Sequence, residues 1–221
     1  MDKTPIDFSN SAFIDKTLSR VHKFYVNEIN PPHEYNSWFE TIRNCPETDV
    51  VVLHINSYGG DLFTAIQFMR VLNESKATIV ASVEGACMSA ATLLFLSANH
   101  WEISDHCMFM FHNYSSGAFG KGGEMYDNIL HGRVWSEKLL RDIYKDFLTS
   151  DEITAILNNK DIWMTGEEVI ARLEKKAVKT EKNKALPPVV KKLVKPAKKT
   201  AKTPKKTAKT PKKTITRRNI M

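Results

Sequence analysis

Apolar and polar positions form recognisable blocks along the first 175 residues of the chain. Residues 21–26 alternate between the two kinds, which is typical of a half-buried strand. Residues 50–55, 77–83 and 107–111 are short apolar runs, as expected for strands buried inside a parallel sheet.

Helical spacing of apolar residues predicts helices at 34–43, 62–72, 89–97, 124–147, 151–157 and 166–173. On the longest of them the predicted apolar face consists of Met125, Ile129, Val134, Leu139, Ile143 and Phe147. Strands that alternate with helices build βαβ units, so the sequence predicts an α/β fold in which helices cover a parallel sheet.

Beyond residue 175 the periodic pattern stops and the composition changes. Residues 175–221 contain 16 Lys and 2 Arg against a single acid, which gives a charge of +17, whereas residues 1–174 carry −10. The sequence AKTPKKT occurs twice in tandem, at 201–207 and 208–214. With few apolar residues and many like charges, residues 176–221 are predicted to be a disordered Lys-rich tail. Because the body is acidic, a basic nucleic-acid-binding domain is excluded for the whole chain.

Other classes of protein are disfavoured by simpler features. We expect neither a secretory signal in the N-terminal arm, residues 1–19, nor a membrane span, because no apolar run approaches the ~18 residues that a span needs. Cys45, Cys87 and Cys107 form no C-x-x-C pair and cannot all pair with one another, so neither a disulfide framework nor a metal site is predicted. A cytoplasmic protein with one domain, residues 20–175, is expected.

Two turns are candidates for chemistry. Ser89 lies between an apolar strand and an apolar helix, where the amides of a helix N-terminus would suit a nucleophile that forms an oxyanion. The alternative is that Ser89 only caps the helix. Gly59 and Gly60 follow a buried strand and either aim a backbone N–H at a reacting oxygen or make a simple tight turn.

A base and an acid are also available. His112 ends the apolar run at 107–111, and His is the usual general base near neutral pH. The chain contains seven His, so composition alone does not select His112, and His54 inside a buried strand is interpreted as structural. Asp161 precedes apolar residues at a helix entry, where it would either orient an imidazole or cap the helix.

Four segments together resemble the ClpP family, the proteolytic subunits of Clp proteases. They are INSYGGD (55–61), GACMSAATLL (85–94), MFMFHNYSSGAFGKGGE (108–124) and KDIWMTGEE (160–168). The intervals from the second Gly to Ser89, from Ser89 to His112 and from His112 to Asp161 are 29, 23 and 49 residues, in agreement with the family. The resemblance covers about residues 20–175.

The resemblance implies a role for each candidate residue. Ser89 would be the nucleophile, His112 the base and Asp161 the acid that orients it. The backbone N–H groups of Gly60 and Ala90 would form the oxyanion hole. A substrate peptide would pair as an added strand with a segment that contains Gly117, Ala118, Phe119 and Gly120.

The resemblance also implies the architecture and the partners. The fold would be a ClpP/crotonase-type superhelix of stacked ββα (βαβ) units. The activity would be that of an ATP-dependent Clp-type serine endopeptidase, which cuts unfolded or tagged polypeptides inside a homo-oligomeric chamber. Two stacked heptameric rings would form the chamber, with helix 124–147 between them. No cofactor is expected, and ATP would enter only through a partner unfoldase of the AAA+ class.

The chain departs from the family pattern in ways that keep alternatives open. Ala90 replaces a Met, Tyr58 and Tyr114 replace prolines, and the basic tail is an addition, which together indicate a divergent, viral or specialised member. The rival hypotheses are an acyl-CoA enzyme of the crotonase superfamily, a Ser/Lys dyad that uses Lys121, and a catalytically silent assembly subunit. The tail would bind nucleic acid or an acidic protein, or act only as a solvated tether.

Overall fold

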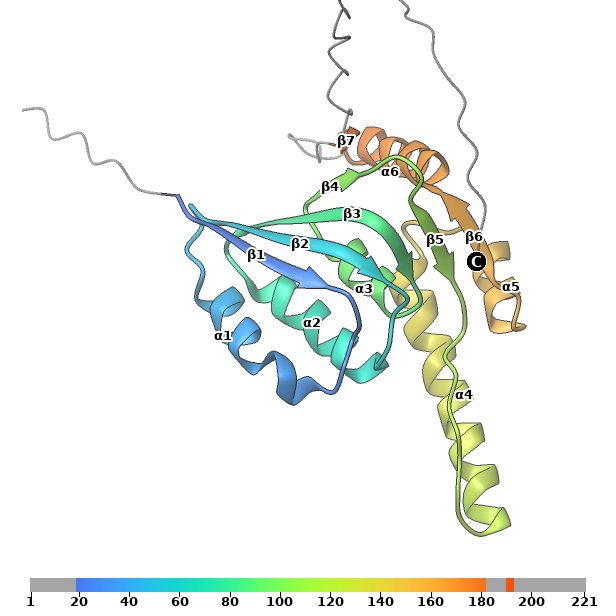
Figure 1. Ribbon diagram of the computed structural model, residues 1–221. Coiled ribbons are helices and arrows are strands. Elements are labelled where there is room, and N and C mark those ends of the chain that lie inside the picture. Colours follow the sequence, from blue (N-terminus) through green and yellow to red (C-terminus); the bar gives the residue numbers. More distant parts are fainter. Residues whose placement is uncertain (1–18, 182–189, 193–221) are drawn as a thin grey trace, which may run out of the picture.

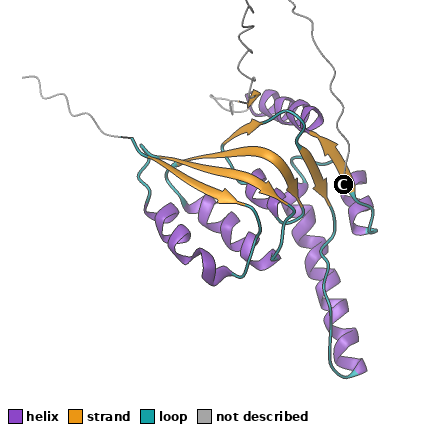
Figure 2. Cartoon of the chain, viewed as in Figure 1, coloured by secondary structure: helices purple, strands orange, loops and turns teal. Residues whose placement is uncertain are grey.

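The computed structural model describes residues 19–181 and 190–192, and in this part of the chain seven strands form one mixed sheet (Figures 1 and 2). The strands are β1 (Val21–Val26), β2 (Val50–Ser57), β3 (Thr78–Met88), β4 (His100–Ile103), β5 (Met108–Phe111), β6 (Ile162–Thr165) and β7 (Val190–Lys192). Their order is β1-β2-β3-β4-β7, with β5 beside β3 and β6 beside β5. The predicted α/β class is confirmed. The sheet is not wholly parallel, however, because β6 pairs antiparallel with β5.

Helices flank this sheet. They are α1 (Asn36–Asn44), preceded by a short 3₁₀ turn (Pro32–Tyr35), α2 (Leu62–Glu74), α3 (Ala91–Leu96), α4 (Gly122–Tyr144), α5 (Ser150–Leu157) and α6 (Gly166–Glu181). Helices α1, α2 and α3 lie together on one face of β1–β3 (Figure 1). The alternate residues of these strands that face the helices, such as Val51, Leu53 and Ile55 of β2, are completely buried. In the described residues no helix has both the length and the apolar character needed to cross a bilayer.

β3 is the strand that organises the sheet. It is longer than predicted, and it uses one edge for two successive partners. Residues 80–83 pair with β4, and residues 86–88 pair with β5. The strand curves between these two pairings (Figure 1). As a result, the C-terminal end of β3 lies beside β5 rather than beside β4.

The predicted apolar face of the longest helix is only partly covered by the core: Ile143 packs against it and Phe147, just beyond the helix, is buried. In α4 the buried residues are Ser136, Leu140 and Tyr144, whereas Ile129 and Val134 are 59% and 66% exposed. The N-terminal part of α4 extends away from the sheet (Figure 1), so only its C-terminal third packs on the core. The spacing of apolar residues identified the helix correctly but not the face that the core covers.

Two elements reach beyond residue 175. α6 continues to Glu181, six residues beyond the predicted end of the domain, and residues 190–192 form β7 beside β4. The rest of the predicted tail, and residues 1–18 of the N-terminal arm, lie outside the described residues. Strands β4, β6 and β7 are too short to give a periodic signal in the sequence.

An ion pair between Arg172 of α6 and Glu152 of α5 links these two helices. The Arg172 guanidinium donates two hydrogen bonds to the Glu152 carboxylate, at 2.8 Å and 2.5 Å. These bonds lower the pKa of Glu152 to about 2. Because this lies below the ~4.3 of an unfolded Glu, the stabilisation is present above pH ~4.3 and is lost as the pH falls toward ~2.

The substitution Glu152→Gln tests this linkage. Gln removes the charge but keeps an oxygen for the cap at Thr149, so at pH 7 we expect a loss of roughly 1–2 kcal/mol in unfolding free energy. The loss is smaller than the pKa shift alone would give, because both side chains remain about a quarter exposed. Urea unfolding from pH ~7 down to pH ~3 should show the difference from wild type shrinking. The control Glu137→Gln breaks an exposed pair with Arg141 and should cost at most ~0.5 kcal/mol. A pH-independent difference would contradict the linkage.

Candidate active site

Ser89 and His112 are in direct contact. The Nε2 atom of His112 lies 2.5 Å from Oγ of Ser89, although the two residues are 23 positions apart in the sequence. Ser89 directly follows β3 and His112 directly follows β5, and these strands pair in parallel. The Ser89 N–H also donates to the carbonyl of Met110 at 2.9 Å, which fixes the two strand ends relative to each other.

Ser89 is held in an uncommon backbone conformation. Its φ is +53°, in the left-handed region that non-glycine residues rarely adopt. α3 begins two residues later, at Ala91, so Ser89 forms the turn between β3 and α3 rather than the first turn of the helix. Such strain persists only where surrounding contacts impose it, and it is common at functional sites.

A second turn, from β2, approaches the same point. Gly59 and Gly60 have φ values of +105° and +141°. A Cβ on Gly59 would lie 2.8 Å from the Cβ of Ser89, and one on Gly60 would lie 2.2 Å from the carbonyl oxygen of Ile29. Glycine is therefore required here by both the backbone angle and the close contact.

These turns border a cavity of about 400 Å³. Its lining residues include Gly60, Phe63, Ser89, Ala90, His112, Asn113, Trp135 and Tyr144. The rings of Phe63 and Trp135 stack with centroids 5.4 Å apart and form an aromatic wall. Within the described residues, the N–H groups of Gly60 and Ala90 have no hydrogen-bond acceptor. The cavity thus combines a hydroxyl, an imidazole, two backbone donors and an apolar surface.

A buried hydrogen-bond chain that the sequence did not reveal supports the Ser89 turn. Oγ1 of Thr92 donates to the Ser89 carbonyl at 2.6 Å, and the Tyr144 hydroxyl lies 2.8 Å from the same Oγ1. Burial raises the pKa of Tyr144 to about 12, so its hydroxyl keeps its proton. Tyr144 has an ordinary position in a helical pattern, and only the packing of α4 brings it under the turn.

Asp161 is not hydrogen-bonded to His112 in the described residues. Asp161 directly precedes β6 and His112 directly follows β5, and the ladder between these strands ends at the pair Phe111–Ile162. The two residues therefore follow the same end of this ladder without being part of it. Asp161 is exposed and does not line the Ser89 cavity.

The predicted substrate-binding residues lie farther out. Gly117, Ala118, Phe119 and Gly120 belong to a segment that forms no strand and runs back along α4 (Figure 1), and Phe119 is 97% exposed. The residues of this connection that do line the cavity are 113–116. The role of residues 117–120 in binding a substrate peptide stays a prediction. Lys121 is exposed at the start of α4 and lies outside the cavity lining.

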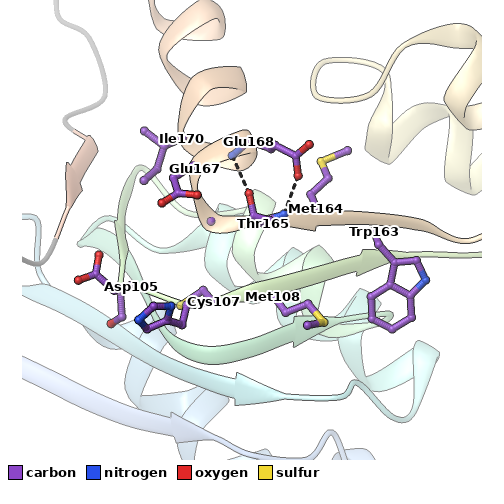
Figure 3. A pocket seen from close by; sticks show the side chains of 12 residues that line it. Asp105, Cys107, Met108, Trp163, Met164, Thr165, Glu167, Glu168 and Ile170 are labelled. Atoms are coloured by element: carbon purple, nitrogen blue, oxygen red, sulfur yellow. Dashed lines mark hydrogen bonds between the residues drawn. The ribbon is translucent and has the colours of Figure 1, made fainter.

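A larger cavity, of about 550 Å³, lies between the β4–β5 turn and the start of α6 (Figure 3). Its only thiol is that of Cys107, which donates to the carbonyl of Val83. Burial raises the pKa of this thiol, which disfavours a reactive thiolate. Glu168, also in the lining, exchanges hydrogen bonds with Thr165 as a helix cap (Figure 3). The Ser89 cavity is therefore the better candidate for catalysis.

Comparison with known proteins shows the family of the chain. The family model of Clp protease matches residues 36–172, a span that contains Ser89, His112 and Asp161. The chain therefore belongs to the Clp protease family, and at the level of the family it is a ClpP-like peptidase. No curated protein matches the chain.

The contact between the two turns gives a test of the site. Gly59→Ala should displace the Ser89 turn, lower the unfolding free energy by roughly 1–3 kcal/mol and slow labelling by a fluorophosphonate at least about tenfold. The matched control is Gly123→Ala, because a Cβ there meets nothing within 4 Å. Alanine in this helical position should leave labelling unchanged and stability equal or higher. Equal labelling rates in both variants would contradict the importance of the contact.

Proposed function

We propose that this protein is a serine endopeptidase that hydrolyses unfolded polypeptides with Ser89 as nucleophile. The observation that carries the proposal is the 2.5 Å contact between Oγ of Ser89 and Nε2 of His112 beside an open cavity. A nucleophile and a base within hydrogen-bond reach are the minimum arrangement for acyl transfer.

In the first half of the reaction, Nε2 of His112 accepts the Ser89 proton as Oγ attacks the peptide carbonyl. The carbonyl oxygen becomes an oxyanion, and the N–H groups of Gly60 and Ala90 donate to it. His112 then gives its proton to the leaving amine, the C–N bond breaks, and an acyl ester remains on Ser89.

In the second half, water replaces the amine. His112 takes a proton from the water while the water oxygen attacks the ester carbonyl, and the same two N–H groups hold the new oxyanion. Return of the proton to Oγ releases the carboxylic acid product and restores Ser89. The reaction needs no cofactor and no metal, which remains a prediction.

Asp161 acts in this proposal as the orienting acid. Its place at the same end of the β5–β6 ladder as His112 supports the assignment, because the last pair of that ladder is Phe111–Ile162. A carboxylate at the second ring nitrogen of His112 would stabilise the imidazolium that forms during the reaction. The hydrogen bond between Asp161 and His112 would form when substrate binds or when the subunits assemble.

Replacement of the nucleophile tests the mechanism. Ser89→Ala should lose both peptide hydrolysis and fluorophosphonate labelling, and His112→Ala should lose nearly as much, because the members of such a group act as a unit. Asp161→Asn should lower kcat by a smaller factor. Mass spectrometry of the labelled peptide should locate the adduct on Ser89.

The control for this test is Ser97→Ala. Ser97 lies at the other end of α3, where its hydroxyl donates to the carbonyl of Leu93, and its removal should leave hydrolysis unchanged. Hydrolysis of an unstructured peptide by Ser89→Ala at the wild-type rate would place the nucleophile elsewhere.

Assembly into a closed ring is the second part of the proposal. The outer part of α4 carries a group of exposed apolar side chains, namely Tyr126, Ile129, Leu130, Val134 and Trp135. Several exposed apolar side chains on one helix are typical of an interface. We propose that these side chains pack against another subunit, within two stacked heptameric rings that enclose the active sites.

Charge introduced on this surface should disrupt the assembly. In sedimentation experiments the wild-type protein should form a large oligomer, whereas the double variant Ile129→Lys, Val134→Lys should form much smaller particles. Peptide hydrolysis per subunit should also fall, because Trp135 and Tyr144 of the same helix line the Ser89 cavity. The control Lys138→Gln, at an exposed polar position of α4, should leave the oligomer intact. A wild-type protein that sediments as a monomer would contradict the proposal.

The remaining expectations stay predictions. A partner AAA+ unfoldase would deliver folded substrates at the expense of ATP, and the cytoplasm would be the compartment. The basic tail would bind nucleic acid or an acidic protein. Among the rival functions, the Ser89–His112 pair argues against the silent subunit and the acyl-CoA enzyme, and the exposure of Lys121 argues against a Ser/Lys dyad.

A further inference from the structure

Three side chains with metal-binding atoms meet at the N-terminal ends of β1 and β2. His22 is the second residue of β1, Asp49 directly precedes β2, and Cys45 directly follows α1. The parallel register pairs His22 with Val51, so both strands begin at the same edge of the sheet. The candidate ligand atoms of the three residues all lie within 4.8 Å of one another.

The carboxylate of this cluster is already fixed in position. One oxygen of Asp49 lies 2.8 Å from Nε2 of His22, and the other accepts the N–H of Arg20 at 3.1 Å. Asp49 is only 3% exposed, and Cys45 only 4%. Metal-binding carboxylates are commonly held by such an outer hydrogen bond, here the one from Arg20. The oxygen that now contacts His22 is the one that the ion would bind, in place of that contact.

The chemistry of the three donors selects the kind of ion. A thiolate, an imidazole and a carboxylate suit Zn²⁺, whereas Mg²⁺ and Ca²⁺ prefer oxygen ligands throughout. We propose that His22, Cys45 and Asp49 bind one Zn²⁺ ion, with a water molecule as the fourth ligand. The inference is independent of the proposed peptidase mechanism.

The adjustment that zinc requires is small. Tetrahedral zinc with bonds of about 2.0–2.3 Å separates its ligand atoms by roughly 3.2–3.8 Å. Rotation of Cys45 about χ1 would turn its Sγ from the carbonyl of Thr41, to which it now donates at 3.1 Å, toward the ion. The Cys45 thiol proton passes to solvent as the Zn–S bond forms. The hydrogen between Nε2 of His22 and Asp49 leaves as the Zn–N bond forms, either to Nδ1 of the same ring or to solvent, so that the lone pair of Nε2 binds the ion.

The location of the site predicts a structural role. Zinc would join the start of β1 to the connection between α1 and β2. Ser89 and Gly60 lie near the opposite, C-terminal ends of β3 and β2. The ion should therefore stabilise the fold without taking part in peptide hydrolysis. The alternative is that His22 and Asp49 form only an ion pair that neutralises a buried carboxylate.

Cobalt substitution distinguishes these two possibilities. Untagged, metal-free, full-length protein is titrated with Co²⁺, and the absorption band of a thiolate–cobalt bond is recorded. One equivalent should produce the band, and Zn²⁺ should displace it. Cys45→Ser should lose the band, His22→Gln should weaken binding at least about tenfold, and Cys107→Ser should keep both. Circular dichroism checks that each variant is folded.

A melting experiment gives an independent readout. Zinc at 100 times its Kd should raise the melting temperature of the wild-type protein by roughly 5–10 °C and that of Cys45→Ser by much less. The proposal is overturned if no thiolate band forms, or if Cys45→Ser binds cobalt and responds to zinc as the wild-type protein does. In either case the cluster is an ion pair beside a buried thiol.

Discussion

The structure depends on the contact between two turns, one at the end of β2 and the other at the end of β3. The space between Gly59 and Ser89 is too small for another side chain, and both residues have positive φ. A hydrogen bond also joins β2 to β3 near these turns, because the side-chain oxygen of Asn56 accepts the N–H of Ala86 at 3.0 Å. The parallel pairing of β2 and β3 brings the turns close enough for this contact and so fixes where the Ser89 hydroxyl lies.

The curvature of β3 then determines what Ser89 meets. Because β3 changes partner from β4 to β5, His112 at the end of β5 arrives beside the serine. β6 adds to the outer edge of β5 in the opposite direction, so that Asp161, which precedes β6, and His112, which follows β5, both lie at one end of this ladder. The three residues thus come from three neighbouring strand ends of one sheet, although they span more than 70 positions of the sequence.

The two ends of the sheet carry different properties. The end with Ser89 is strained and borders an open cavity, and in the part of the chain that the structure describes its Gly60 and Ala90 N–H groups have no acceptor, as a reacting site requires. The end with Asp49 is closed around a fixed carboxylate, a histidine and a thiol, which suits a stabilising site. α4 extends from the Ser89 site to the proposed subunit interface. Its last residue, Tyr144, supports the Ser89 turn, and its exposed apolar residues lie nearer to its N-terminus.

The sequence determined the α/β class, most of the longer helices and strands, and the resemblance that selected Ser89, His112 and Asp161, because local periodicity and short motifs carry this information. It could not assign the buried face of α4, the antiparallel β6 or the end of α6, since these depend on which surfaces pack together. The roles of Thr92, Tyr144 and the His22–Cys45–Asp49 cluster also came only from the tertiary structure. Their side chains have no motif spacing, and only the sheet and its helices bring Thr92 and Tyr144 within hydrogen-bond distance and the ligand atoms of the cluster within 4.8 Å of one another.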